Sequence, residues 1–210
     1  MIDTDRASEV WRVTLNRPEK ANSLTGAMLE ELVAVADAAQ AAGPKALILT
    51  GAGRVFSAGA DLDAARAGLA TSPLWERLSG AIATLPCLTI AALNGTVAGG
   101  AFGMALACDI RIAVPEARFF YPVMRLGFLP QPSDPGRMAA LIGQARAKMI
   151  LMAGQKIGAD EALAWGLIDR IVASEAISEA AGALAADAHG AEPGHIAAIK
   201  ALFGTPPGAG

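Results

Sequence analysis

Apolar residues recur along this chain with two different spacings, which predict alternating strands and helices. In residues 11–15 Trp, Val and Leu alternate with Arg and Thr, a two-residue period that indicates a strand. Over residues 25–42 the apolar positions follow a helical period, and Gly43-Pro44 ends it. Three short, continuously apolar runs are typical of strands in a sheet that is covered on both faces: residues 46–49, 88–93 and 110–114.

Further helix signals alternate with one more strand signal. Serine before proline predicts helices that start at Ser72-Pro73 and at Ser133-Asp134-Pro135, with serine as the N-cap. The remaining segments are predicted as helices over residues 98–108 and 159–165, a strand over 168–172, and a helical stretch over 174–203. Because strands and helices alternate, we expect an α/β fold with crossover connections. We expect a core domain over residues 1–173, the helical segment 174–203, and a flexible tail at 204–210.

Composition narrows the class of protein. The 210 residues suit one domain, and 17 basic against 20 acidic residues give a net charge of −3, which argues against a nucleic-acid binder. A hydrophobic content of 53% excludes intrinsic disorder. Two cysteines without a CxxC pair exclude a disulfide scaffold and a cysteine-based zinc site, and no metal is expected. His189 and His195 are the only histidines, so catalysis has to use other groups.

One uncharged stretch raises the alternative of a membrane protein. Residues 78–108 carry no charged side chain and contain a GxxxGxxxG series that begins at Gly95, a pattern of packed membrane helices. Pro86 and the turn signal Asn94-Gly95 divide this stretch into elements that are each too short to span a membrane. The first ten residues hold no apolar leader. We therefore expect a soluble, cytoplasmic protein.

Two glycine-rich segments are the candidate sites of chemistry. Ala58-Gly59-Ala60-Asp61 and Ala98-Gly99-Gly100-Ala101 each follow an apolar strand and lead towards a helix. Backbone N–H groups at such a helix start lack partners, and small residues let a ligand oxygen approach them. Two facing segments would form an oxyanion hole for a polarised carbonyl. The alternative is that the glycines only permit turns and close packing. The nucleotide-binding and nucleophile-elbow signatures GxGxxG, GxxxxGK[ST] and GxSxG are absent.

Six ordered segments carry a family resemblance. They are LNRPEKANSL at 15–24, ALILTG at 46–51, FSAGADL at 56–62, NGTVAGG at 94–100, CDIRIA at 108–113 and ADEALAWGLI at 159–168. In this order and spacing the chain resembles the crotonase superfamily of enoyl-CoA hydratases and isomerases. The resemblance implies a spiral of ββα units, an acyl-CoA thioester ligand and a homo-trimer or dimer of trimers. It implies no cofactor, because CoA is part of the thioester substrate.

The resemblance also implies roles for individual residues. The backbone N–H groups of Ala60 and Gly100 match the two donors to the thioester carbonyl. The positions that match the family's CoA site are Lys20, Ala21, Ala58 and Asp61. Lys20 and Asp61 are also explained as ordinary surface residues.

The carboxylates of family hydratases are missing here. Their two glutamate positions are Gly103 and Val123, and a position where some relatives carry aspartate is Gln131. Adding water to a double bond needs an acid and a base, so ordinary hydratase chemistry is in doubt. The candidate substitutes are Asp61, Asp63, Asp134 and Tyr121.

Each substitute has a plain structural alternative. Asp134 is also explained as a favourable charge at a helix start, Asp63 as a solvated helix residue, and Tyr121 as a half-buried packing aromatic. Relatives usually extend further at the carboxyl end, so we expect a more open pocket or a lid from a partner subunit. For glutamates at positions 103 and 123 we expect retained folding with a weak gain of activity. This requires that Gly103 lines a cavity; if Gly103 is a packing glycine, the added side chain overpacks the site, typically at a cost of about 1–3 kcal/mol.

Three functions follow as hypotheses. The first is an enzyme that stabilises an enolate, by isomerisation or decarboxylation rather than hydration. The second is a non-catalytic acyl-CoA-binding member of the fold. The third is a scaffold without a ligand. The two retained glycine loops, at residues 58–61 and 98–101, argue against this third hypothesis.

Overall fold

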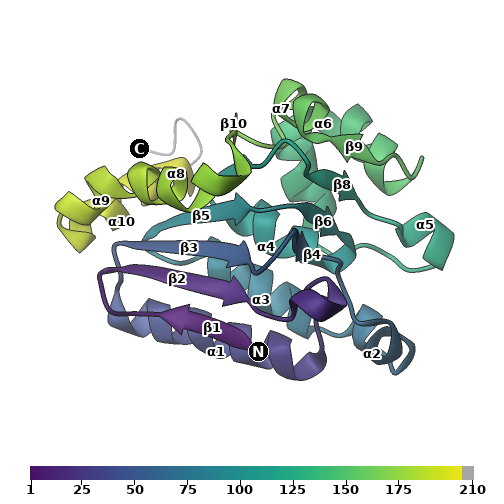
Figure 1. The fold of residues 1–210 in the computed structure, drawn as a ribbon, viewed down its shortest axis with the longest axis horizontal. Coiled ribbons are helices and arrows are strands. Elements are labelled where there is room, and N and C mark those ends of the chain that lie inside the picture. The colour runs from purple at the N-terminus through teal and green to yellow at the C-terminus, as the bar shows by residue number, and fades with distance from the viewer. Residues whose placement is uncertain (205–210) are drawn as a thin grey trace.

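Two β-sheets form the frame of this structure, a computed structural model in which residues 1–204 are described (Figure 1). The larger sheet has the strand order β1-β2-β3-β5-β7-β10, in which only β1 runs antiparallel to its neighbour. Its strands are β1 (Ile2–Asp5), β2 (Val10–Leu15), β3 (Ala46–Gly51), β5 (Leu88–Leu93), β7 (Ile110–Ala113) and β10 (Arg170–Ile171). The continuously apolar runs therefore form its central strands, as their composition predicts.

A smaller sheet stands beyond the ends of these strands, in the order β4-β6-β8-β9. Its strands are β4 (Val55–Ser57), β6 (Thr96–Ala98), β8 (Arg118–Phe120) and β9 (Ile157–Gly158). Each of β4, β6 and β8 directly follows a strand of the larger sheet, and helices follow in turn. This repetition of strand, short strand and helix is the spiral of ββα units that the resemblance implies, and the α/β prediction is confirmed.

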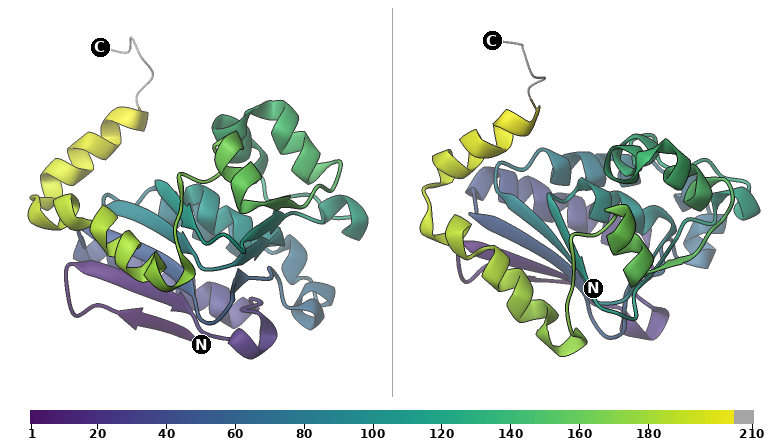
Figure 2. Two further views of the ribbon diagram at one scale, coloured as in Figure 1. Left: turned by 45° about the horizontal axis from the view of Figure 1, so that its top comes forward. Right: turned by 90° about the horizontal axis from the view of Figure 1, so that it is seen from above.

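Helices cover both faces of the larger sheet (Figure 2). Helices α1 (Gly26–Ala42), α3 (Leu74–Ala83) and α4 (Phe102–Ala107) pack side by side on one face, and α8 (Ile177–Leu184) packs against β5 and β7 on the other. The remaining helices are α2 (Leu62–Arg66), α5 (Val123–Leu126), α6 (Asp134–Leu151), α7 (Ala159–Trp165), α9 (Ala186–Gly190) and α10 (Pro193–Gly204), with short 3₁₀ turns η1 (Pro18–Lys20), η2 (Leu69–Thr71), η3 (Gly99–Ala101) and η4 (Ser174–Ala176).

Local sequence signals explain the bounds of two of the helices, α1 and α7. Thr25 caps α1 by accepting a hydrogen bond from the Met28 N–H, and Gly43 ends the helix in the left-handed conformation with φ of 65°. Gly166 ends α7 in the same way, with φ of 85°. Both helices therefore have the limits that the sequence predicts.

Several predicted bounds were wrong by one or more residues. The helix predicted from residue 98 starts later, because Ala98 belongs to β6 and the turn η3 precedes α4. Helix α3 begins at Leu74, although the Ser72 hydroxyl does accept the Leu74 N–H. The late strand β10 is shorter than residues 168–172, and Ser133 precedes α6 without a side-chain cap.

The uncharged stretch that raises the membrane alternative is divided among several elements. It contains the end of α3, the strands β5 and β6, the turn η3 and helix α4. Among residues 1–204, none of the helices combines the length and the hydropathy that crossing a membrane requires. The predicted helical stretch 174–203 is present as η4 and α8–α10, whereas residues 205–210 of the expected tail lie outside the described residues.

We expect Gly95→Ala to destabilise the fold. A Cβ at Gly95 would overlap the backbone carbonyl of Arg54 in the segment before β4, and backbone cannot move aside as a side chain can. Overpacking of this kind typically costs about 1–3 kcal/mol. Thermal unfolding would measure the loss, with Gly80→Ala as the control because a Cβ at Gly80 in α3 meets nothing within 4 Å. Equal melting temperatures of the two variants would contradict the prediction.

Candidate acyl-binding site

The two glycine-rich loops emerge at equivalent points of neighbouring strands. Strands β4 and β6 are parallel and pair Ser57 with Val97, so Ala60 and Gly100 each lie three residues beyond this pair. The sequence predicts that the loops follow the long strands β3 and β5 directly. In the structure the short strands β4 and β6 lie between the long strands and the loops. This placement sets the two candidate donors side by side at one edge of the smaller sheet.

Glycine is required where the two loops touch. Gly59 and Gly99 both have positive φ, of 87° and 53°. A Cβ at Gly59 would lie 2.7 Å from the carbonyl oxygen of Ala98, and a Cβ at Gly99 would lie 3.9 Å from the Cα of Gly59. Only residues without a side chain allow this backbone contact at the observed conformation.

The hydrogen bonds around Ala60 turn its own N–H away from the neighbouring segment at Leu24. Leu24 donates its N–H to the Gly59 carbonyl and accepts the Asp61 N–H, both at 2.8 Å. Ala60 is the bridge partner of Leu24, and its own N–H takes part in neither bond. Gly100 lies in the first turn of η3, where N–H groups have no partner within the helix. Within residues 1–204, neither the Ala60 nor the Gly100 N–H has a hydrogen-bond acceptor.

Both loops border one small cavity of about 240 Å³. Its walls are formed by the loop residues Ala58, Ala60, Gly99 and Gly100, by Leu62, Ala65, Ala70 and Trp75, and by a segment that contains Tyr121, Pro122, Val123, Arg125, Leu126, Phe128, Leu129 and Gln131. Most of these side chains are apolar. The unpaired N–H groups therefore belong to residues that line an apolar space, which suits a carbonyl attached to an acyl chain.

Trp75 supports the Gly100 loop from α3. Its indole N–H donates to the Leu69 carbonyl at 2.7 Å, which fixes the ring. A Cβ at Gly100 would lie 3.0 Å from this ring, so the tryptophan and the loop are already in contact. The wall of the cavity is thus held in place next to one of the candidate donors.

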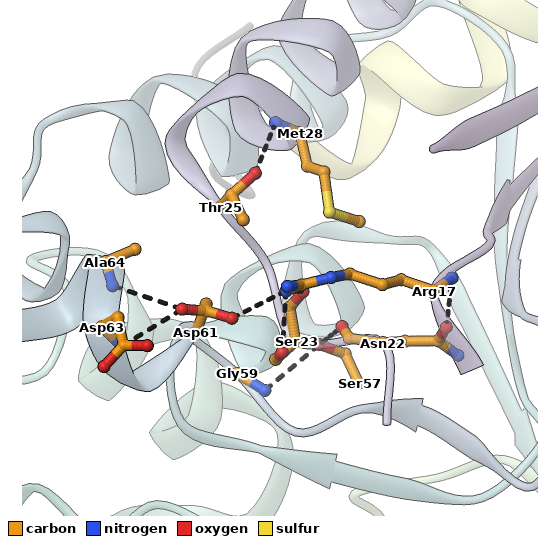
Figure 3. Close-up of polar contacts among 10 residues, drawn as sticks. All are labelled: Arg17, Asn22, Ser23, Thr25, Met28, Ser57, Gly59, Asp61, Asp63 and Ala64. Atoms are coloured by element: carbon orange, nitrogen blue, oxygen red, sulfur yellow. Dashed lines mark hydrogen bonds and ion pairs between the residues drawn. The ribbon is translucent and has the colours of Figure 1, made fainter. Parts of the chain in front are cut away.

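The predicted CoA-site residues differ in what their side chains contact, and Figure 3 shows the contacts of Asp61. Ala58 lines the cavity, and its N–H donates to the Ala21 carbonyl at 3.0 Å, whereas the side chain of Lys20 is exposed. The Asp61 carboxylate accepts from Arg17 at 2.8 Å and from the N–H groups of Asp63 and Ala64 at the start of α2. The hydrogen bond from Arg17 lowers the pKa of Asp61. The Asp61 side chain therefore supports the loop rather than reaching into the cavity.

Three residues that the sequence analysis did not single out also hold this loop. The side-chain amide of the buried Asn22 donates to the carbonyls of Ala52 and Val55, and the main-chain carbonyl of Asn22 accepts the Ser57 hydroxyl at 2.8 Å. Ser57 in turn accepts the Gly59 N–H, and Arg17 completes the set (Figure 3). Arg17 and Asn22 lie in the segment at 15–24 and Ser57 in the segment at 56–62, which was the only signal for them.

The positions that lack carboxylates do not share one environment. Val123 and Gln131 line the cavity, and the Gln131 amide donates to the Ala70 carbonyl at 3.3 Å. Gly103 is buried in α4 and is not among the residues that line the cavity. A Cβ there would lie 3.1 Å from Oδ1 of Asp134. Gly103 is therefore a packing glycine, and the condition for accommodating a glutamate there, a position that lines the cavity, is not met.

Asp134 lies behind the cavity wall, in contact with Tyr121, which is part of that wall. The Tyr121 hydroxyl donates to Oδ2 of Asp134 at 2.9 Å. Asp134 lies in the first turn of α6, yet its exposed fraction is 0%, so it is not a solvated helix-start charge. Tyr121 is 3% exposed rather than half-buried. Burial raises the pKa of Asp134 to about 7 and also raises the pKa of Tyr121.

Other candidate groups are placed away from this cavity. Asp63 is exposed and forms an ion pair with Arg66. Both histidines lie in the carboxyl-terminal helices α9 and α10. Cys87 and Cys108 are buried, and desolvation raises the pKa of Cys87 to about 11. None of these groups is positioned to act on a ligand between the two loops.

A larger cavity of about 750 Å³ lies between the sheet and the carboxyl-terminal helices. Leu88 and Ile110 border it on one side, and Ile199 in α10 on the other. Its charged residues include Asp109 and Lys200, which pair with each other at 2.8 Å. Neither glycine-rich loop borders this larger cavity, so the smaller cavity is the better candidate site.

Comparison with known proteins assigns the chain to a family. The family model described as enoyl-CoA hydratase/isomerase matches residues 5–206. The chain belongs to the enoyl-CoA hydratase/isomerase family. The enoyl-CoA hydratase of Bacillus anthracis, a solved structure of this family, is 33% identical with a TM-score of 0.90, and the match covers 97% of this chain and 82% of that chain.

Curated relatives in this family carry different reaction names. The short-chain-enoyl-CoA hydratase of Clostridium acetobutylicum is 35% identical over 179 residues, which cover 80% of this chain and 67% of the relative. The 1,2-epoxyphenylacetyl-CoA isomerase of Escherichia coli is 33% identical over 186 residues, which cover 84% of this chain and 71% of the relative. Membership of the enoyl-CoA hydratase/isomerase family therefore does not by itself fix the reaction.

Proposed function

We propose that this family member binds an acyl-CoA thioester and polarises its carbonyl with the backbone N–H groups of Ala60 and Gly100. The observation that carries the proposal is the equivalent position of these two residues beyond a paired point of β4 and β6, at one cavity, with neither N–H occupied within residues 1–204. Two donors at one oxygen stabilise the negative charge that an enolate places there.

The CoA part of the ligand is proposed to lie along the surface formed by Lys20, Ala21, Ala58 and Asp61. The exposed ammonium group of Lys20 suits a phosphate, and the small side chains of Ala21 and Ala58 leave room for a narrow pantetheine arm. Asp61 contributes through its backbone and through the Arg17 ion pair that holds the loop. No further cofactor is proposed, because CoA belongs to the substrate itself.

The proposed chemistry is isomerisation or decarboxylation through an enolate rather than standard hydration. Both reactions use the oxyanion hole and need fewer proton-transfer groups than water addition does. The second candidate is a non-catalytic acyl-CoA-binding protein, which is favoured by the uncharged residues Gly103, Val123 and Gln131. By family resemblance we also propose a cytoplasmic homo-trimer or dimer of trimers.

Replacing the thioester by a thioether tests the carbonyl contact. We expect S-butyl-CoA, which has no carbonyl, to bind about tenfold or more weakly than butyryl-CoA, since two net hydrogen bonds of about 1 kcal/mol each are lost. Calorimetry measures both affinities. Infrared difference spectra of ¹³C-labelled butyryl-CoA should show the carbonyl band moved to lower wavenumber in the complex. Equal affinities and an unshifted band would reject the oxyanion hole.

A glycine variant provides the matched control for this experiment. Gly59→Ala should remove the band shift, because its Cβ would collide with the Ala98 carbonyl and separate the loops. Gly154→Ala places the same residue at a similar positive φ of 68°, where nothing lies within 4 Å of the new Cβ. The second variant should keep the shift although it carries the same kind of backbone strain.

A further inference from the structure

The Tyr121–Asp134 pair joins the cavity wall to a fully buried carboxyl group. Tyr121 follows β8, lines the cavity, and stacks on Phe102 of α4 with ring centroids 5.6 Å apart. Its hydroxyl contacts Oδ2 of Asp134 at 2.9 Å and also accepts the Gln131 N–H at 3.4 Å. The pair therefore reaches from the ligand space into the interior between α4 and α6.

One oxygen of this carboxyl group is unused. Oδ1 of Asp134 is buried and has no hydrogen-bond partner among residues 1–204. It faces Gly103: a Cβ placed on that glycine would lie 3.1 Å from Oδ1 of Asp134. Native proteins rarely leave a buried polar atom unsatisfied, and each case calls for an explanation. A role that needs the carboxyl group to gain and lose a proton is one such explanation.

The location places this carboxyl group within reach of the proposed reaction centre. Gly100 and Gly103 are three positions apart where η3 leads into α4, so they lie one turn apart along the same helical segment. Asp134 contacts the Gly103 position, and Tyr121 lies between Asp134 and the cavity. The acyl part of a thioester whose oxygen lies at Gly100 would thus share one cavity with Tyr121.

We infer that Tyr121 and Asp134 move a proton to and from the α-carbon of the bound acyl-CoA, with Tyr121 as the catalytic residue and Asp134 acting through it as a positioning residue that holds the proton. This inference rests on the proposed function, since it needs the thioester in the oxyanion hole. It names a group of this chain that supplies proton chemistry where Gly103 and Val123 have none.

The proton transfer is balanced in both directions. In enolisation the Tyr121 oxygen takes the α-hydrogen while its own proton passes to Oδ2 of Asp134. The C–H electron pair becomes the enolate double bond, and the negative charge of the carboxylate moves to the thioester oxygen. In the reverse step Asp134 returns its proton to Tyr121, and Tyr121 delivers one to the carbon. The 2.9 Å contact serves both states, because either oxygen is the donor in turn.

The surroundings of Asp134 make this step dependent on pH. The groups that face it are the Tyr121 hydroxyl, the Arg137 guanidinium on α6 and the Glu76 carboxylate on α3. Desolvation is the largest influence and sets the pKa of Asp134 at about 7, with Tyr121 and Arg137 lowering it and Glu76 raising it. Enolisation needs the ionised carboxylate, so its rate should rise with pH through this value and then level off.

Exchange of the α-hydrogens of butyryl-CoA in D₂O tests the inference without knowledge of the true substrate. Mass spectrometry follows deuterium uptake, and calorimetry measures binding of the same ligand. We expect uptake with the wild-type protein, and a loss of at least about 10²-fold in both Asp134→Asn and Tyr121→Phe, with affinity changed less than about threefold. The rise of the rate near pH 7 should disappear in Asp134→Asn, which a merely structural role would not produce.

Asp160→Asn is the matched control, because Asp160 also lies in the first turn of a helix but is exposed. It should exchange like the wild type. Exchange that persists in both pair variants, with butyryl-CoA bound, would overturn the inference while the oxyanion hole stands. Absence of exchange in the wild type with the carbonyl band shifted would also overturn it and favour the non-catalytic binder. Absence of butyryl-CoA binding by the wild type would reject the proposed function itself.

Discussion

Crotonyl-CoA is expected to be hydrated at least about 10²-fold more slowly by this protein than by a hydratase with two active-site carboxylates. Hydration needs a base for water and an acid for the α-carbon, and each such group typically contributes about 10²–10⁴-fold. Positions 103 and 123 hold glycine and valine, and Val123 is an apolar part of the cavity wall. The Tyr121–Asp134 pair would serve the α-carbon but leaves the water without a base.

Loss of the enoyl absorbance of crotonyl-CoA measures this rate directly. The assay is informative when calorimetry shows that the ligand is bound, because a slow rate then reports chemistry rather than affinity. The Bacillus anthracis enoyl-CoA hydratase, a relative with the same fold, is a convenient reference enzyme. A rate within about tenfold of the reference would mean that another residue activates the water.

Gly103→Glu is expected to destabilise the protein by about 3–5 kcal/mol. The new side chain would start 3.1 Å from Oδ1 of Asp134 and 3.5 Å from Cβ of Ser79, in a region without free space. It would add overpacking to a second buried carboxyl group beside one that already lacks a partner at Oδ1. Thermal or denaturant unfolding measures the loss.

A second substitution tests the cause of this loss. Asp134→Gly removes the carboxyl group that occupies the space, so the double variant Gly103→Glu/Asp134→Gly should recover most of the stability lost in Gly103→Glu. Val123→Glu is the comparison at the other position, where the side chain faces the cavity and the loss should be smaller. If Gly103→Glu unfolds like the wild type, the packing between α4 and α6 differs from that described.

Local sequence signals predicted the long elements because those signals act within one element. The periods of residues 11–15 and 25–42 and the apolar runs of β3, β5 and β7 are sufficient without knowledge of their neighbours. Strands β4, β6 and β8 were missed, because three residues are too few to show a period. They exist through pairing with one another across about 20–40 residues of chain, which a local pattern does not contain.

The candidate site divides in the same way. The glycine loops were found because small residues after apolar strands are visible in the sequence, and the six segments fixed the family. The burial of Asp134 was not visible, since it depends on Tyr121 and Gly103, which come from two other segments. A serine–aspartate–proline signal predicts a helix start correctly and says nothing of which way the carboxylate turns.

The loop contact between Gly59 and Gly99 has a consequence for how such proteins diverge. The candidate donors are main-chain atoms, so most exchanges of the Ala60 side chain leave the N–H in place, and only proline deletes it. Selection on the candidate oxyanion hole therefore falls on the neighbouring glycines, which both have positive φ, and an added Cβ at Gly59 would collide with backbone. Proton-transferring side chains come from other segments, as Tyr121 and Asp134 do, and are free to be lost or replaced separately. A lineage is thus able to exchange one reaction for another, or for simple binding, without rebuilding the part that would hold the thioester.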